Sequence, residues 1–158
     1  MSGLLRVLFR PWLRMTNRVV LASWNAEDAR EVTAWPLTAD RIRRVDQAIA
    51  GYGASDAPAD HTVHPRGPTR RRSLDTLVGD VTRNERLRLA IEGAGLTARE
   101  FVLTREALLQ ALLAYAMAFG DPSAADEASR VNVSFVARHQ AELQDIGRRW
   151  QRLDTGGH

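Results

Sequence analysis

The sequence predicts an all-α protein: a small helical bundle with an N-terminal amphipathic helix and an extended linker. Three observations predict this fold class. Apolar residues recur at helical spacing along most of the chain, and Ser, Thr and Asn stand at positions typical of helix N-caps. No segment alternates apolar and polar residues as a half-buried strand does. The 158 residues are enough for one ordinary domain.

The composition excludes several kinds of chemistry. There is no cysteine, which excludes disulfides, zinc–thiolate sites, iron–sulfur clusters and a cysteine nucleophile. All 22 basic residues are arginine, so Schiff-base chemistry and a P-loop lysine are excluded as well. The motifs G-x-S-x-G and H-E-x-x-H and a glycine-rich phosphate loop are also missing. We therefore predict a protein that is not an enzyme and holds no cofactor and no metal.

Residues 1–24 are predicted to form an amphipathic, basic anchor helix. At about 100° per residue, its apolar side chains fill one half of the helix and four arginines form a stripe on the other half. Pro11 interrupts the pattern and predicts a kink or a new helix start. The segment contributes +4 to a net charge of +3, which leaves −1 for residues 25–158.

A helix of this kind suits an anionic bilayer interface or an apolar partner surface. Each arginine beside an anionic surface contributes about 1 kcal/mol, so four contribute on the order of 4 kcal/mol. A secretory signal is disfavoured because no uninterrupted apolar run of seven residues exists, and a transmembrane span is disfavoured by the four arginines within the candidate window. The alternative is that this helix packs on the protein's own bundle. The residues predicted to contact a membrane or partner are Leu5, Arg6, Leu8, Phe9, Arg10, Trp12, Leu13, Arg14, Arg18, Trp24, Trp35, Arg70, Arg71 and Arg72.

Residues 25–53 are predicted to be a short helical segment, with a loop or short helix followed by a helix that Thr38 caps and Gly51 or Gly53 ends. Residues 54–72 contain many glycines and prolines and predict an extended linker that ends in the basic run Arg70–Arg72. The linker pair His61 and His64 has too few neighbouring ligands for a metal site.

Residues 73–154 are predicted to be the helical bundle domain. Helices are expected to begin at Ser73, at Asn84 and at Thr97, where Thr97 and Glu100 form a capping box. Residues 107–119 are apolar nearly all round but too short to span a bilayer, so they predict a central core helix that includes Tyr115 and Met117.

A last helix is expected to begin at Asn132 as its N-cap. Its apolar stripe contains Val136, His139, Leu143, Ile146, Trp150 and Leu153. His139 could ligate a haem or chlorin, but a core histidine with a hydrogen-bond partner is the favoured interpretation. Trp150 could also serve, like the other tryptophans, as an anchor at an interface.

Two stretches, LTAREFVLT (96–104) and NVSFVARHQAEL (132–143), resemble a group of small, uncharacterised bacterial helical proteins. Those proteins carry L-T-x-x-E-(F/Y)-V before an Ala/Leu-rich helix and N-x-x-F-x-x-x-H-x-x-E-L near the C-terminus. PLTADRIRR (36–44) is similar to their opening, so the resemblance covers about residues 36–145. The resemblance implies a helical fold and assigns no activity. The resembling proteins usually carry a cleavable export signal, and this chain departs from them in its arginine-striped first segment.

These features predict a non-enzymatic structural or accessory subunit that binds and stabilises a larger membrane-protein complex through its N-terminal helix and linker. Its expected partners are subunits of that complex and an anionic lipid surface, on the cytoplasmic face of the membrane. One candidate host is a bacterial photosynthetic reaction-centre–light-harvesting complex. One alternative is an exported, periplasmic protein of the envelope. Another is a nucleic-acid-binding helical protein, which is disfavoured because the helix after Thr97 is too apolar to enter a DNA groove.

Overall fold

The computed structural model describes residues 24–54, 73–118 and 120–155, with side chains described as far as Trp150. Within these ranges the chain is all-α, as predicted, with seven α-helices and one 3-10 turn and no strand. The elements are α2 (Ala26–Ala34), α3 (Ala39–Gly53), α4 (Leu74–Arg83), α5 (Glu85–Gly93), α6 (Ala98–Met117), η1 (Pro122–Ala124), α7 (Arg130–Arg138) and α8 (Gln140–Thr155).

Most helix starts follow from local sequence. The side chains of Thr38, Ser73, Asn84 and Thr97 each accept a hydrogen bond from a backbone N–H in the first turn of the following helix. Thr97 and Glu100 complete the predicted capping box, since the Thr97 N–H also donates to the Glu100 carboxylate at 2.9 Å. The region between Asn25 and Pro36 contains a helix, α2, which Asn25 caps. The predicted helix starts at Thr38, Ser73, Asn84 and Thr97 are confirmed.

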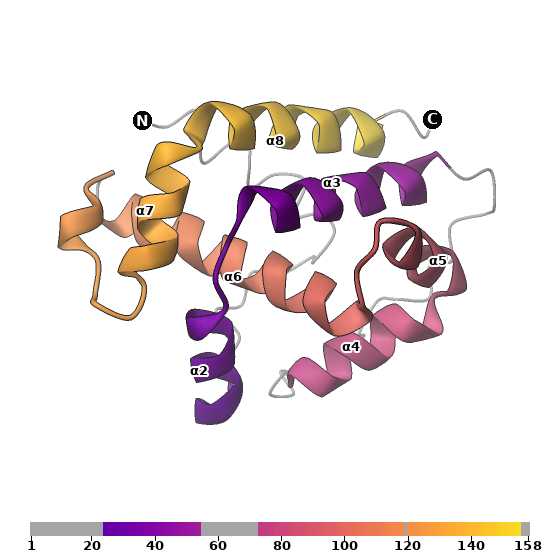
Figure 1. Cartoon of the computed structure of the whole chain (residues 1–158), viewed down its shortest axis with the longest axis horizontal. Helices are drawn as coiled ribbons and strands as arrows, with labels where there is room; N and C mark the ends of the chain where they lie inside the picture. Colours follow the sequence, from indigo (N-terminus) through magenta and orange to yellow (C-terminus); the bar gives the residue numbers. More distant parts are fainter. Residues whose placement is uncertain (1–23, 55–72, 119, 156–158) are drawn as a thin grey trace.

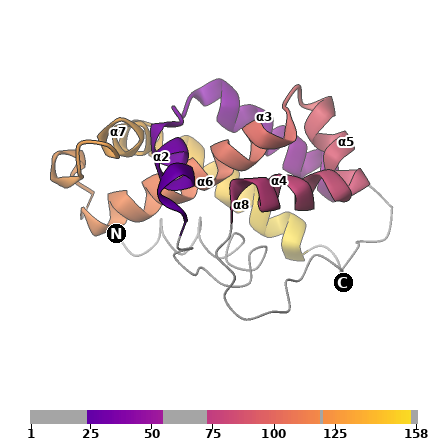
Figure 2. The same ribbon diagram turned by 90° about the horizontal axis from the view of Figure 1, so that it is seen from below.

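Helix α6 lies at the centre of the bundle and touches α2, α3, α4, α5 and α7 (Figure 1). Helices α3 and α8 lie together on one side of it, and α2 and α4 lie on the opposite, lower side in the same view. When the bundle is seen from below, α2 and α4 are in front of α6 and α8 is farther back (Figure 2). The predicted segments 25–53 and 73–154 therefore share one hydrophobic core.

The predicted last helix is wrong in two respects. The chain breaks at His139, so that one expected helix becomes α7 and α8. Asn132 is not an N-cap but lies inside α7, buried at 6% exposure. The break has a packing reason: α7 packs mainly against α6, while α8 packs against α3, and one straight helix would not cover both neighbours. The predicted stripe is nevertheless buried at Val136, Leu143, Ile146 and Trp150.

The predicted central core helix is buried over only part of its length. Its side chains are buried at Ala107, Leu108, Ala111 and Leu112, but the following residues are half-buried and Met117 is 78% exposed. The prediction that Met117 is a core residue is therefore wrong. The C-terminal end of α6 reaches the side of the bundle where α7 lies, so fewer helices surround it there (Figure 1).

Candidate functional site

The candidate site is the place where two arginine-rich segments, residues 1–23 and the run Arg70–Arg72, precede described residues of the bundle. All but two of the predicted contact residues lie in residues 1–23 or 55–72, outside the described ranges. The predicted contacts of these residues therefore stay predictions. The first described residue is Trp24, which follows residues 1–23. The description resumes at Ser73, which follows Arg70–Arg72.

Asp28 of α2 joins the two attachment points. Its Oδ2 accepts a hydrogen bond from the Leu74 backbone N–H at 3.0 Å and another from the Asn25 side-chain amide at 2.9 Å. The Asp28 backbone N–H in turn donates to the Asn25 Oδ1 at 2.8 Å. The first residues of α2 and α4 therefore lie side by side, although 46 residues separate Asp28 from Leu74 in the sequence.

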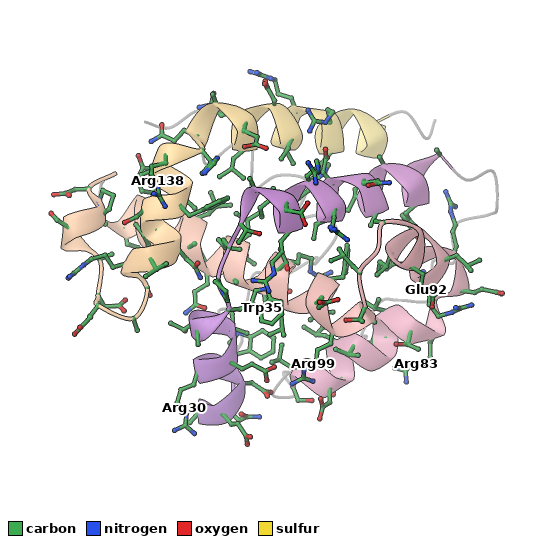
Figure 3. The ribbon with its side chains drawn as sticks, viewed as in Figure 1. Arg30, Trp35, Arg83, Glu92, Arg99 and Arg138 are labelled. Atoms are coloured by element: carbon green, nitrogen blue, oxygen red, sulfur yellow. The ribbon has the colours of Figure 1, made fainter. Side chains whose placement is uncertain are left out.

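Arg99 ties α6 to the same two helices. Its guanidinium donates to both carboxylate oxygens of Glu31 on α2, at 3.1 and 2.6 Å, and to Asp75 on α4 at 3.0 Å. These hydrogen bonds, first from Glu31 and then from Asp75, raise the pKa of Arg99 above its ordinary value. Arg99 lies next to the N-terminal end of α4 (Figure 3). Since its side chain is 44% exposed, these pairs orient the three helices more than they stabilise them.

We call this region the α2–α4 junction. It consists of the N-terminal ends of α2 and α4 together with Arg99, and its residues are Asn25, Asp28, Glu31, Ser73, Leu74, Asp75 and Arg99. Its polar groups form hydrogen bonds and ion pairs within the protein, and Leu74 is buried in the hydrophobic core, so the junction joins α2, α4 and α6.

The two predicted contact residues that are described, Trp24 and Trp35, both pack partly buried against the bundle core. The Trp35 Nε1 donates to the Thr104 hydroxyl at 3.0 Å, and the Arg41 guanidinium lies 4.2 Å from the centre of a Trp35 ring. Both tryptophans therefore have partners within the protein, and their contact with an external partner stays a prediction. The interpretation of Trp150 as an interface anchor is wrong, because it is 4% exposed and donates to Asp46 at 2.8 Å.

Sequence reasoning missed the role of Asn132. Its side chain donates to the Trp35 carbonyl at 2.9 Å and accepts from the Leu37 N–H at 3.0 Å, which fastens the α2–α3 connection to α7. A signal was present in the sequence, since Asn132 precedes Val136 by four residues and so lies on the same apolar stripe. A polar side chain at a buried position needs such partners.

His139 is hydrogen-bonded, as expected, but it is only partly buried. Its ring stacks on Phe135 with the centroids 4.2 Å apart, and its Nδ1 lies 3.2 Å from a Glu142 carboxylate oxygen. In the described part of the chain, no three His, Asp or Glu side chains are grouped so that they could hold a metal ion.

None of the helices in the described ranges combines the length and the hydrophobicity of a transmembrane span. No protein-family model, curated protein or solved structure matches the chain. The resemblance to uncharacterised bacterial helical proteins therefore stays a prediction, and function has to be argued from the chain itself.

Proposed function

We propose that this protein is a non-enzymatic accessory subunit of a membrane-protein complex that attaches peripherally to an anionic membrane surface through residues 1–24. The distribution of charge along the chain carries the proposal. Residues 1–24 contain four arginines and no acidic residue. The described ranges 24–54, 73–118 and 120–155 instead contain three more acidic residues than arginines. The net positive charge of the chain therefore comes from residues outside the described ranges.

Many arginines of the bundle are paired within their own helices. Five of them form ion pairs with an acidic residue three or four positions away: Arg43 and Arg44 with Asp40, Arg83 with Asp80, Arg88 with Glu92, and Arg148 with Asp145. Residues 1–24 offer no acidic residue for such pairs, so their arginines are suited to an external anion. An apolar face opposite the arginine stripe adds the burial that a bilayer interface provides.

The experiment is flotation of the full chain with vesicles of phosphatidylcholine, with and without phosphatidylglycerol. We expect binding only to the anionic vesicles, and we expect the quadruple variant R6Q/R10Q/R14Q/R18Q to bind about 1000-fold more weakly. The matched control is R43Q/R83Q/R88Q/R148Q, which removes the same charge from the bundle. Since these arginines sit in exposed pairs, the control should fold and keep most of its vesicle affinity.

Two results would overturn the proposal. Equal losses in the two quadruple variants would show that net charge matters and residues 1–24 do not. Tighter binding to duplex DNA than to anionic vesicles, with a steep salt dependence, would favour the nucleic-acid alternative. Purification of the native protein from membranes tests the other half of the proposal, because the subunits of a host complex should accompany it.

A further inference from the structure

We infer that α2 is a hinged arm whose end toward α3 is fixed in the core, while its start is held by exposed polar contacts that ionic strength weakens. In its open state, α2 leaves α6 and α4 while the rest of the bundle stays folded. The inference concerns the described bundle alone and does not depend on the attachment of residues 1–24 to a membrane.

The hinge is the connection between α2 and α3. The Trp35 indole N–H donates to the hydroxyl of Thr104, which is fully buried in α6. The buried Asn132 side chain donates to the Trp35 carbonyl and accepts from the Leu37 N–H. Leu37 itself belongs to the hydrophobic core. Because a buried polar group that loses its partner is costly, these contacts keep the connection in place.

The body of α2 has few apolar contacts with the bundle. All nine of its residues are described, and only Val32 is buried. Helix α5 also buries a single side chain, but it packs against α3, α4 and α6, whereas α2 packs chiefly against α6. The Thr33 hydroxyl accepts a hydrogen bond from Gln110 of α6, and Trp24, just before α2, is half-buried against the core. A helix with so few buried contacts opens at a lower free energy than the core.

The start of α2 is held by ion pairs at the α2–α4 junction. Arg99 of α6 donates to both carboxylate oxygens of Glu31, and also to Asp75 of α4. The Glu31 side chain is 34% exposed and that of Asp75 is 88% exposed. Exposed ion pairs stabilise a fold only slightly and are screened by salt. This end of α2 should therefore release more readily than the hinge, and more readily as the salt concentration rises.

Opening of the arm separates contacts that are close in space but belong to different helices. It breaks the Arg99 contact with Glu31, the Gln110 contact with Thr33 and the hydrogen bond from the Leu74 N–H to Asp28. It leaves the Arg99 contact with Asp75 intact, because both residues stay in the folded bundle. In Figure 1, α2 extends from the lower edge of the bundle, away from α3 and α8, so no neighbouring helix blocks this movement.

Hydrogen exchange of the full chain, followed by NMR, tests the inference. We expect the backbone amides of Val32 and Thr33 to exchange at least about 10-fold faster than those of Leu103 in α6, with little dependence on low urea concentrations, because opening exposes little surface. The Trp35 indole N–H should stay protected while α2 exchanges. Equal rates and equal urea dependence in α2 and α6 would overturn the arm, and loss of the indole protection together with that of α2 would overturn the hinge.

A core variant separates opening of the arm from unfolding of the bundle. Ile146→Val, at a buried position of α8, should lower the protection of the α6 amides about fivefold, because it destabilises the whole fold. The same variant should leave the protection of α2 unchanged, because the α8 core stays folded when α2 opens. A parallel fall in α2 would show that α2 opens only with the whole bundle.

Charge variants test the ion pairs at the start of α2. Arg99→Gln should lower the protection of the α2 amides about fivefold, and raising NaCl from about 0.05 to 0.5 M should do the same in the native chain. The matched control is Arg88→Gln, whose exposed pair with Glu92 lies within α5. It should leave the protection of α2 and its salt response unchanged. Equal effects of the two variants, or a full salt response in Arg99→Gln, would contradict the inference, while vesicle binding and the proposed function would stand.

Discussion

Asn132 and Trp35 are joined across the bundle, although 97 residues separate them in the sequence. The Asn132 side-chain amide donates to the Trp35 carbonyl at 2.9 Å, and the Trp35 indole N–H donates to Thr104 of α6 at 3.0 Å. Thr104 is fully buried and Asn132 nearly so. One short connection between α2 and α3 is therefore held by polar groups of both α6 and α7, and it places α2 and hence the α2–α4 junction.

The first prediction concerns this connection. Asn132→Ala removes the partner of two backbone groups, the Trp35 carbonyl and the Leu37 N–H. A buried group that loses its partner costs about 1–3 kcal/mol, so we expect the free energy of unfolding to fall by about 2 kcal/mol. Urea unfolding followed by circular dichroism measures it. Ser134→Ala, at a half-buried position of the same helix, is the control and should change stability by less than about 0.5 kcal/mol. Equal effects of the two variants would contradict the prediction.

The second prediction concerns the contact of α3 with α8. Asp46 accepts hydrogen bonds from the Trp150 indole N–H and from Arg149. Asp46→Ala removes this acceptor and should lower the free energy of unfolding by about 1–2 kcal/mol. Asp46→Asn keeps one oxygen for the indole and should cost less. Thermal unfolding of both variants gives the comparison, and equal losses of stability in the asparagine and alanine variants would show that charge, not the acceptor oxygen, stabilises this contact.

The third prediction compares the two halves of α6. Leu108→Ala empties a position that is 2% exposed and should cost about 2–4 kcal/mol, because it removes buried methyl groups and leaves a cavity. Met117→Ala changes a side chain that is 78% exposed and should alter stability by less than about 0.5 kcal/mol. Urea unfolding midpoints of the two variants test this prediction. Similar losses of stability in both variants would contradict it, because they would mean that Met117 is covered in solution.

The fourth prediction is a pH dependence at the start of α6. Hydrogen bonds from the Thr97 backbone N–H, and then from its hydroxyl, lower the pKa of Glu100 below its ordinary value of 4.5. A lowered pKa in the folded state means that the carboxylate stabilises the fold above pH 4.5 and that this contribution is lost as the pH falls through the folded value. Glu100→Gln should therefore cost up to about 1 kcal/mol at neutral pH and progressively less in acid.

The control for Glu100 is a double-mutant cycle with Thr97→Ala. Because the two side chains bind each other's backbone N–H groups, Glu100→Gln should cost less when Thr97 is already alanine. The free energy of unfolding of the four proteins is compared at pH 7 and at pH 3. An equal cost in both backgrounds would mean that the capping box does not cause the effect.

Features that depend on neighbouring residues were predictable from the sequence. The caps at Thr38 and Asn84 and the capping box at Thr97 form between residues three positions apart. The buried stripe of α3 follows the helical repeat at Ile42, Val45 and Ile49. The length of the buried part of α6 was not predictable, because it depends on how far the surrounding helices extend and not on the hydrophobicity of α6 itself.

The same distinction applies to the candidate site. The arginine-rich segments are visible as patterns of composition and spacing, but nothing in those patterns shows that the helices that follow them, α2 and α4, begin side by side. The side-by-side arrangement of α2 and α4 depends on the hydrogen bond from the Leu74 N–H to Asp28 and on the Arg99 contacts with Glu31 and Asp75.

The sequence by itself determined the helical class, the places where most helices begin and the concentration of net positive charge in residues 1–24. It could do so because caps, helical periodicity and charge are properties of residues close together in the chain. Only the tertiary structure decided that the last helix is interrupted at His139 and that the buried Asn132 side chain hydrogen-bonds the α2–α3 connection. It also decided that α2 and α4 begin side by side. These features arise from contacts between distant residues, each of which must satisfy its own polar groups and cover its own apolar face once the helices pack.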